Sequence, residues 1–197
     1  MKAVVLAVSE SDLKERHARS LDRWDEMWEG VLHMPPAPDL GHQGFASRLT
    51  RFLGNECERR LGGEVFMQAS LHDPANPKKN YRVPDLLYVA KGNERVLQKR
   101  GVVGAADAVI EVRSPDGESY DKFPFFARLG VRQVIVVDAD TREQEVYRLA
   151  GREYVAVAPD KSGWIVSEVL GVRFRWNQRR HSLRVEALDD PAFAIEV

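Results

Sequence analysis

The spacing of hydrophobic positions predicts one long helix in the first third of the chain. From Gly41 onward apolar residues recur every three or four positions, as a helix with one buried face requires, and the run ends at Gly62 and Gly63. Glycine is common just past a helix C-terminus because it adopts positive φ at little steric cost. The apolar positions of this helix are Phe45, Leu49, Phe52, Leu53 and Leu61. A shorter polar helix, capped by Ser9 or Ser11, is predicted to precede it and to end near residue 21.

Segments rich in β-branched and aromatic residues predict the strands. They cover residues 28–34, 65–71, 81–89, 108–112 and 133–137. The last two are continuously apolar, which is typical of strands covered on both faces. A helical segment at about 120–129 separates them, so they should be parallel neighbours with a right-handed crossover. Pro124 fits only the first turn of this helix, which should therefore begin near Asp121.

The C-terminal third predicts antiparallel hairpins. Residues 145–149 and 152–157 flank Ala150 and Gly151, and residues 172–176 alternate in period two before a last strand at 182–186. The whole pattern predicts an α+β fold with a central mixed β-sheet flanked by helices. We expect one domain over 1–197, in which 1–23 form an N-terminal helical segment and 139–197 supply hairpins that complete it.

Composition agrees with a folded globular protein of 197 residues, 44% of them hydrophobic and 30% charged. No apolar run approaches the roughly 18 residues of a membrane span, and the N-terminus lacks a secretory signal, so a cytoplasmic protein without membrane contact is expected. Cys57 is the only cysteine, which excludes an internal disulfide and a multi-cysteine zinc site. No glycine-rich phosphate loop occurs, so no nucleotide cofactor is expected.

Basic residues concentrate in two stretches although the net charge is only −1. Residues 78–100 contain seven basic and two acidic side chains, and residues 173–184 contain five arginines and no acid, so each stretch has a local charge of +5. A basic face of this kind suits a polyanion such as DNA. Charged loops are also commonly just solvated surface, and both interpretations stay open.

Two carboxylates interrupt otherwise apolar strands: Asp85, directly after Pro84, and Glu111. An unpaired carboxylate inside a protein costs several kcal/mol. Each residue alone is compatible with a salt bridge at a strand end. If their strands are neighbours, however, the two side chains can converge on one hard cation, and oxygen ligands suit Mg²⁺ or Mn²⁺.

Lys122 follows Glu111 by eleven residues, in the first turn of a helix predicted to pack back over the strand of Glu111. Two carboxylates and a lysine are the minimal set for metal-dependent phosphodiester hydrolysis, in which the ammonium orients water or stabilises developing negative charge. The neighbouring Asp121 is either a further ligand or a helix-start charge. The sequence therefore predicts catalytic roles for Asp85, Glu111 and Lys122.

Short motifs at these positions resemble the Uma-two (Uma2) family of restriction endonucleases, within the PD-(D/E)-x-K nuclease superfamily. The motifs are 83–86, 109–115, 121–122, 130–131 and 134–138, together with an opening segment at 28–35 and His42. The resemblance extends from about residue 24 to 154 and is weaker at 169–188. It implies a restriction-endonuclease-like fold and an Mg²⁺-dependent or Mn²⁺-dependent endonuclease that acts on DNA. We also expect a homodimer, because double-strand cleavage by a nuclease with a single site usually needs two subunits.

The resemblance also implies roles for particular residues. Asp85 and Glu111 match the two metal ligands of the superfamily, and the backbone carbonyl of Val112 would complete the metal site. The superfamily lysine position holds Arg113 here, which can clamp a phosphate but cannot act as a base, so the lysine role falls on Lys122. Glu29 matches an additional carboxylate near the family's site, and His42 matches a polar residue that supports the site.

Two other functions remain compatible with the sequence. The fold could serve as a catalytically inactive module that binds nucleic acid or a protein partner, which the near-neutral charge and Arg113 favour. The site could also hydrolyse RNA or a smaller phosphodiester. Metal binding between Asp85 and Glu111 would distinguish an enzyme from an inactive module.

Overall fold

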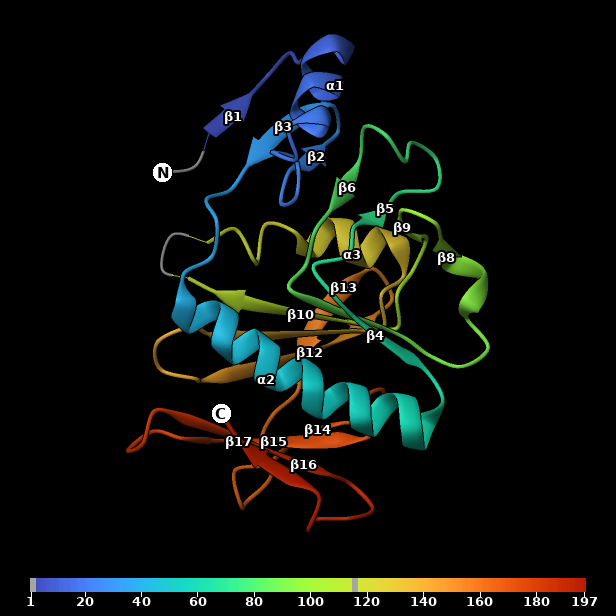
Figure 1. Ribbon diagram of the computed structural model, residues 1–197. Helices are drawn as coiled ribbons and strands as arrows, with labels where there is room; N and C mark the ends of the chain where they lie inside the picture. Colours follow the sequence, from blue (N-terminus) through green and yellow to red (C-terminus); the bar gives the residue numbers. More distant parts are fainter. Residues whose placement is uncertain (1–2, 115–116) are drawn as a thin grey trace.

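A mixed six-stranded sheet forms the centre of the computed structural model, which describes residues 3–114 and 117–197 (Figure 1). Pro115, part of the motif at 109–115, lies outside the described residues. The strand order is β13-β12-β11-β10-β7-β4. The bounds are β4 (Glu64–Met67), β7 (Leu86–Val89), β10 (Ala108–Arg113), β11 (Gln133–Asp138), β12 (Gln144–Ala150) and β13 (Glu153–Ala156). Within this sheet only β10 and β11 pair in parallel, and they are joined through α3 (Phe123–Leu129), which confirms the predicted strand, helix, strand unit and the mixed α+β fold.

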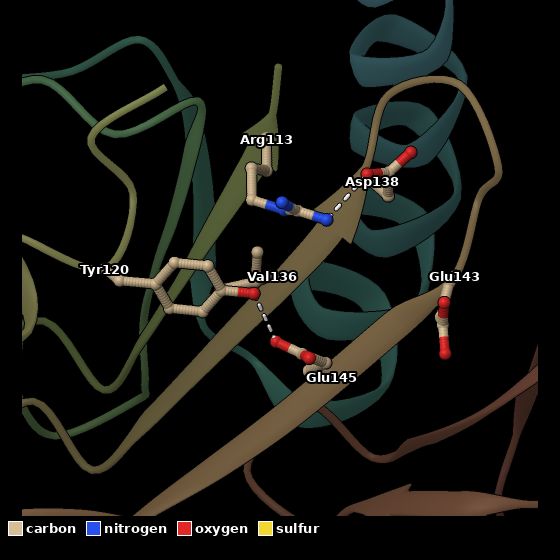
Figure 2. A pocket seen from close by; sticks show the side chains of 6 residues that line it. All are labelled: Arg113, Tyr120, Val136, Asp138, Glu143 and Glu145. Atoms are coloured by element: carbon tan, nitrogen blue, oxygen red, sulfur yellow. Dashed lines mark hydrogen bonds and ion pairs between the residues drawn. The ribbon is translucent and has the colours of Figure 1, made fainter. Parts of the chain in front are cut away.

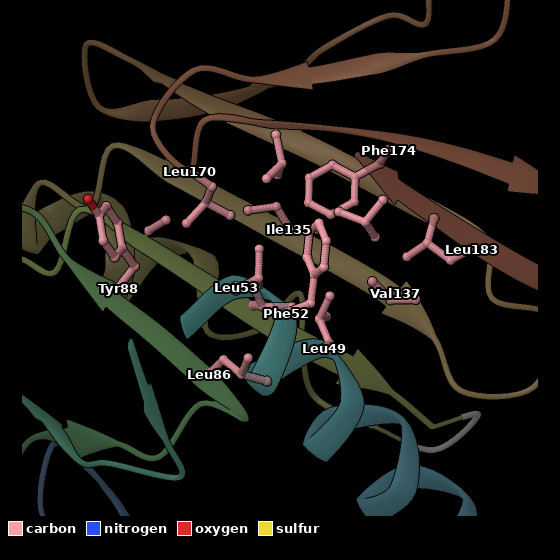
Figure 3. Close-up of a cluster of buried hydrophobic side chains, with 14 of the residues drawn as sticks. Leu49, Phe52, Leu53, Leu86, Tyr88, Ile135, Val137, Leu170, Phe174 and Leu183 are labelled. Atoms are coloured by element: carbon pink, nitrogen blue, oxygen red, sulfur yellow. The ribbon is translucent and has the colours of Figure 1, made fainter. Parts of the chain in front are cut away.

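The long helix is also confirmed. Helix α2 (Leu40–Glu56) begins at Asp39, whose side chain accepts a hydrogen bond from the backbone N–H of His42 at 2.8 Å. It continues into a π-helical turn, η1 (Cys57–Leu61), and stops at Gly62 with φ of 72°. Its apolar face is buried against the central sheet and the C-terminal sheet (Figure 3). The amphipathic pattern therefore locates the helix that crosses the middle of the molecule.

The strands of the N-terminal sheet differ from those predicted from the sequence. Its order is β1-β3-β2-β6-β5-β9-β8. The bounds are β1 (Ala3–Val5), β2 (Glu26–Trp28), β3 (Val31–Met34), β5 (Leu71–His72), β6 (Tyr81–Arg82), β8 (Leu97–Gln98) and β9 (Gly101–Val103), with α1 (Glu10–Ala18) after β1 and η2 (Glu94–Val96) before β8. The single strand predicted at 28–34 is instead part of a hairpin, because Glu29 and Gly30 both adopt positive φ, at 52° and 94°.

Two predicted strands are each broken and shared between sheets. The segment 65–71 turns at Gln68, where φ is 54°, and leaves the central sheet as β4 to enter the N-terminal sheet as β5. The segment 81–89 divides in the same way into β6 and β7, and Pro84 occupies the break, where it lacks an N–H for a ladder hydrogen bond. The break leaves Asp85 just outside the central sheet, immediately before β7.

Both predicted hairpins are present: the first is β12 and β13 of the central sheet, and the second lies in the C-terminal sheet. The C-terminal sheet contains β14 (Ile165–Ser167), β15 (Val172–Asn177), β16 (Ser182–Ala187) and β17 (Ala194–Glu196) in simple antiparallel order. Phe174, Leu183 and Val185 on its inner face are fully buried in one hydrophobic cluster with α2 and the central sheet (Figure 3). Among the described residues, no helix has the length and apolar character needed to cross a bilayer.

Candidate active site

Asp85 and Glu111 come together where β7 pairs with β10. The two strands are antiparallel with Ile110 opposite Leu86, so the residue before β7 lies beside the residues that follow Ile110. Asp85 Oδ2 accepts a hydrogen bond of 2.7 Å from the backbone N–H of Val112. The Asp85 carboxylate thereby accepts the hydrogen bond that the Val112 N–H would otherwise donate to a neighbouring strand, which is interrupted at Pro84. The predicted neighbourhood of the two acidic residues is present in the structure.

The backbone carbonyl of Val112 faces the same edge. In an extended strand the N–H and C=O of one residue point to the same side, and the Val112 N–H points to Asp85. The next carbonyl, of Arg113, points the other way and accepts a hydrogen bond from Ala139 N–H at 2.8 Å. The Val112 oxygen therefore lies on the side of the strand where Asp85 does, as a third oxygen ligand would require.

Lys122 reaches this edge from the start of α3, where it is the N-cap residue. Its Nζ lies 3.1 Å from each carboxylate oxygen of Glu111 and 2.9 Å from Oε1 of Glu26. The lysine side chain is 12% exposed and both carboxylates are 5% exposed, so the three charges are almost completely withdrawn from solvent. Lys122 and Glu111 are together, as the sequence predicted.

Glu26 is the site residue that sequence analysis missed. Besides Lys122, its carboxylate accepts hydrogen bonds from Val83 N–H at 2.9 Å and from Trp28 Nε1 at 2.8 Å. Glu29 was predicted as the additional carboxylate, but it lies on the exposed turn after β2, 3.2 Å from Arg128. The error arose because the predicted strand began at Trp28. An acid beside the apolar pair Met27 and Trp28 was the available signal.

His42 supports Asp85 as predicted for a polar neighbour. Its Nε2 lies 2.7 Å from Asp85 Oδ1, and the histidine is buried in the first turn of α2. Burial acts to lower the pKa of His42, but the hydrogen bond and the charge of Asp85 outweigh it and raise the pKa. Asp85 is therefore held at one oxygen by His42 and at the other by Val112.

Arg113 and Asp121 stand apart from these contacts. Arg113 donates to Asp138 at 2.7 Å beside Tyr120, whose hydroxyl donates to Glu145 at 2.5 Å (Figure 2). These groups surround a recess of about 20 Å³, enough for about one water. With several carboxylates around it, this recess does not suit a phosphate. Asp121 is exposed just before α3.

The buried cluster brings the three carboxyl groups of Asp85, Glu26 and Glu111 near the ammonium of Lys122. Burial raises the pKa of Glu111 to about 8; the charges of Asp85 and Glu26 add to the rise and Lys122 opposes it. Burial acts to lower the pKa of Lys122, but Glu111 and Glu26 outweigh it, so the pKa is raised and the ammonium stays protonated at neutral pH. With a pKa of about 8, Glu111 holds a proton at neutral pH, and a divalent cation bound there would displace it.

The donor set fits a magnesium-like ion in part. Among the residues that the structure describes, no three acidic, histidine or cysteine side chains converge into a metal site on their own. Mg²⁺ does not require such a cage, because it usually keeps several waters and binds one or two carboxylates and substrate phosphates. Asp85, Glu111 and the Val112 carbonyl would be its protein ligands, and Glu111 would have to share its oxygens with Lys122.

Comparison with known proteins agrees with the fold. A family model described as "Uma2: Putative restriction endonuclease" matches residues 14–197. Among solved structures, the chain is similar to "a putative nuclease belonging to DUF820 from Anabaena variabilis ATCC 29413", with 18% sequence identity and a TM-score of 0.59, over 74% of this chain and 82% of that one. Among curated proteins, none matches.

Proposed function

The chain belongs to the Uma2 family, and we therefore propose that it hydrolyses DNA phosphodiester bonds as an Mg²⁺-dependent endonuclease. One observation carries the proposal: Asp85, directly before β7, lies beside Glu111 of the paired strand β10, and Lys122 Nζ is 3.1 Å from both oxygens of Glu111. Carboxylates can hold a metal ion that lowers the pKa of a bound water, and a nearby ammonium can stabilise negative charge that develops on a phosphate.

Each residue has a role that follows from its contacts. Bound Mg²⁺ or Mn²⁺ would supply a water of lowered pKa and neutralise charge on the phosphate. Asp85 and Glu111 would hold the ion, and His42 orients Asp85. Because Lys122 is protonated, it would position the attacking water and stabilise negative charge developing on the phosphate rather than take a proton. Glu26 keeps the ammonium in place.

A second candidate function is an inactive module that binds DNA or a protein partner. It is favoured by one observation: both oxygens of Asp85 and both oxygens of Glu111 already accept hydrogen bonds from protein groups. The two functions differ in metal affinity. Calorimetric titration with Mn²⁺ should show binding that Asp85→Asn abolishes if the protein is an enzyme, and no binding at millimolar concentration if it is a module.

Nicking of supercoiled plasmid tests the enzyme directly. We expect cleavage in Mg²⁺, none in EDTA, and a loss of about 10²- to 10³-fold in Glu111→Gln, since removing one such electrostatic group costs about that much. Glu29→Gln is the matched control, because it makes the same change on an exposed turn and should cut like the wild type. Equal cutting by all three proteins would identify a contaminating nuclease and overturn the proposal.

Dimerisation forms part of the proposal. A single hydrolytic site per subunit cuts one strand at a time, so double-strand cleavage calls for two copies. Sedimentation equilibrium at micromolar concentration should give twice the chain mass. A monomer that still makes double-strand breaks in one binding event would contradict this part alone.

A further inference from the structure

The outer face of the C-terminal sheet displays most of the second basic stretch of the sequence. Phe174 and its neighbours on the inner face are buried, so the alternate residues of β15 and β16 face outward. We call this surface the arginine face. It consists of Trp164, Arg173, Arg175, Arg184 and Glu186. By contrast, Arg82 of the first basic stretch is buried between the rings of Trp28 and Phe125.

A single carboxylate serves two guanidinium groups on this face. Glu186 accepts hydrogen bonds from Arg173 Nη2 at 2.7 Å and from Arg184 Nε at 2.6 Å. Glu186 is buried beneath them, whereas the two arginine side chains are about one-third exposed, at 32% and 38%. The acid thus fixes the direction of both arginines without neutralising the surface.

The register of the strands adds an unfavourable pair. Arg175 lies directly opposite Arg184, and like charges in that position destabilise a sheet. The guanidinium groups of Arg173 and Arg175 both lie over the Trp164 ring, at 4.3 and 4.4 Å from its centroid, so the ring restrains both side chains. Natural sequences usually keep such a local conflict where it has a function.

The turn between β15 and β16 extends the positive charge. Arg179 and Arg180 are both exposed there, and Arg180 is 4.0 Å from Glu196. Five arginines therefore share the nearby carboxylates of Glu186 and Glu196. Fixed, closely spaced guanidinium groups with excess positive charge complement a row of phosphates, which they can bind through two N–H groups each.

We infer that the arginine face and its turn bind the phosphate backbone of duplex DNA, at a surface separate from the acidic cluster. Figure 1 shows the C-terminal sheet on the opposite side of α2 from β2 and β3. The choice of DNA among polyanions rests on the proposed function. Contacts to phosphates carry no sequence information, so this surface would increase affinity for DNA of any sequence.

Fluorescence polarisation in EDTA tests binding without cleavage. For a labelled 30-base-pair duplex at 100 mM salt, we expect Arg175→Gln combined with Arg179→Gln to weaken binding about tenfold. The slope of log Kd against log salt should fall by about 2, because each lost phosphate contact removes about 0.9. The double replacement by lysine should keep most of the slope, since the charges remain.

The matched control is Arg148→Gln combined with Arg152→Gln, two exposed arginines near the β12–β13 turn. It removes the same charge and should change affinity less than twofold. Wild-type binding by the Arg175 and Arg179 variant, or an equal loss in the control, would overturn the inference. Failure of the proposed function would appear differently, as DNA binding at this face without Mg²⁺-dependent cleavage.

Discussion

The acidic cluster and the arginine face are electrostatic opposites. In the cluster one ammonium, Lys122, is shared by the carboxylates of Glu26 and Glu111. On the arginine face one carboxylate, Glu186, is shared by two guanidinium groups. The first group is almost fully buried, whereas the two arginines of the second are about one-third exposed. In the proposals above, the first would bind a metal ion and the second phosphate.

Burial makes charge more costly to the stability of the fold in the acidic cluster than on the arginine face. Uncompensated charge in the interior costs several kcal/mol, so the acidic cluster depends on supporting hydrogen bonds from Val83, Trp28 and His42. Exposed charges are screened by water and salt, and a pair of them changes stability by about 0 to 1 kcal/mol. The acidic cluster should therefore respond strongly to single substitutions, and the arginine face weakly.

The largest expected effect follows removal of the Lys122 ammonium. Lys122→Ala takes away the ion-pair partner of the buried Glu26 carboxylate, and we expect the free energy of unfolding to fall by about 4 kcal/mol. Urea denaturation at pH 7.5 in EDTA measures it. Adding Glu26→Gln to this variant should restore part of the loss. A loss below about 1 kcal/mol would show that the cluster is hydrated. The acidic cluster and the arginine face would then respond alike to single substitutions.

The core that joins the two regions comes next. Leu183 of β16 is fully buried in the cluster shared with α2, and Leu183→Ala should lower the free energy of unfolding by about 3 kcal/mol through lost burial and a residual cavity. Leu188, which is 40% exposed, is the control, and Leu188→Ala should cost less than about 0.5 kcal/mol. One unfolding transition by tryptophan fluorescence and by circular dichroism is expected; two would mean that the C-terminal sheet unfolds independently.

Sequence reasoning was successful where periodicity carried the information. The long helix, the parallel pair β10 and β11 and the C-terminal hairpins follow from spacing that one buried face imposes. The pairing of Lys122 with Glu111 was also predictable, because a helix that follows a strand packs back over it. These elements are local or nearly local in the sequence.

The errors arose where the chain changes direction. Positive φ at Glu29 and Gln68 bends segments that look continuous by composition. Gly30 was a turn signal at the first bend, whereas residues 65–71 contain no glycine or asparagine to indicate the second. Glu26 was missed for the same reason, since its contact with Lys122 joins residues far apart in the sequence through the hairpin of β2 and β3. Long-range contacts of this kind leave no periodic trace.

The pH dependence of stability would sharpen the electrostatic contrast. The pKa of Glu111 is about 8 in the folded protein, above its ordinary value, so between the two values the folded protein binds one more proton than the unfolded chain. The free energy of unfolding must then fall as pH rises from about 5 to 8, on the order of 1 kcal/mol per pH unit. Urea denaturation in EDTA should show this slope, and Glu111→Gln should flatten it. An unchanged slope in that variant would assign the effect to another group.

The smallest expected effect belongs to the arginine face. Arg184→Ala removes one of two guanidinium partners of Glu186 but also relieves the repulsion with Arg175 across the strands. These changes oppose each other in a solvent-exposed setting, so the free energy of unfolding should change by less than about 0.5 kcal/mol. Urea denaturation at 50 mM and 500 mM salt checks this, and the difference should shrink further at high salt because the charges are screened. A loss as large as that of Lys122→Ala would mean that this face is maintained for stability rather than for binding.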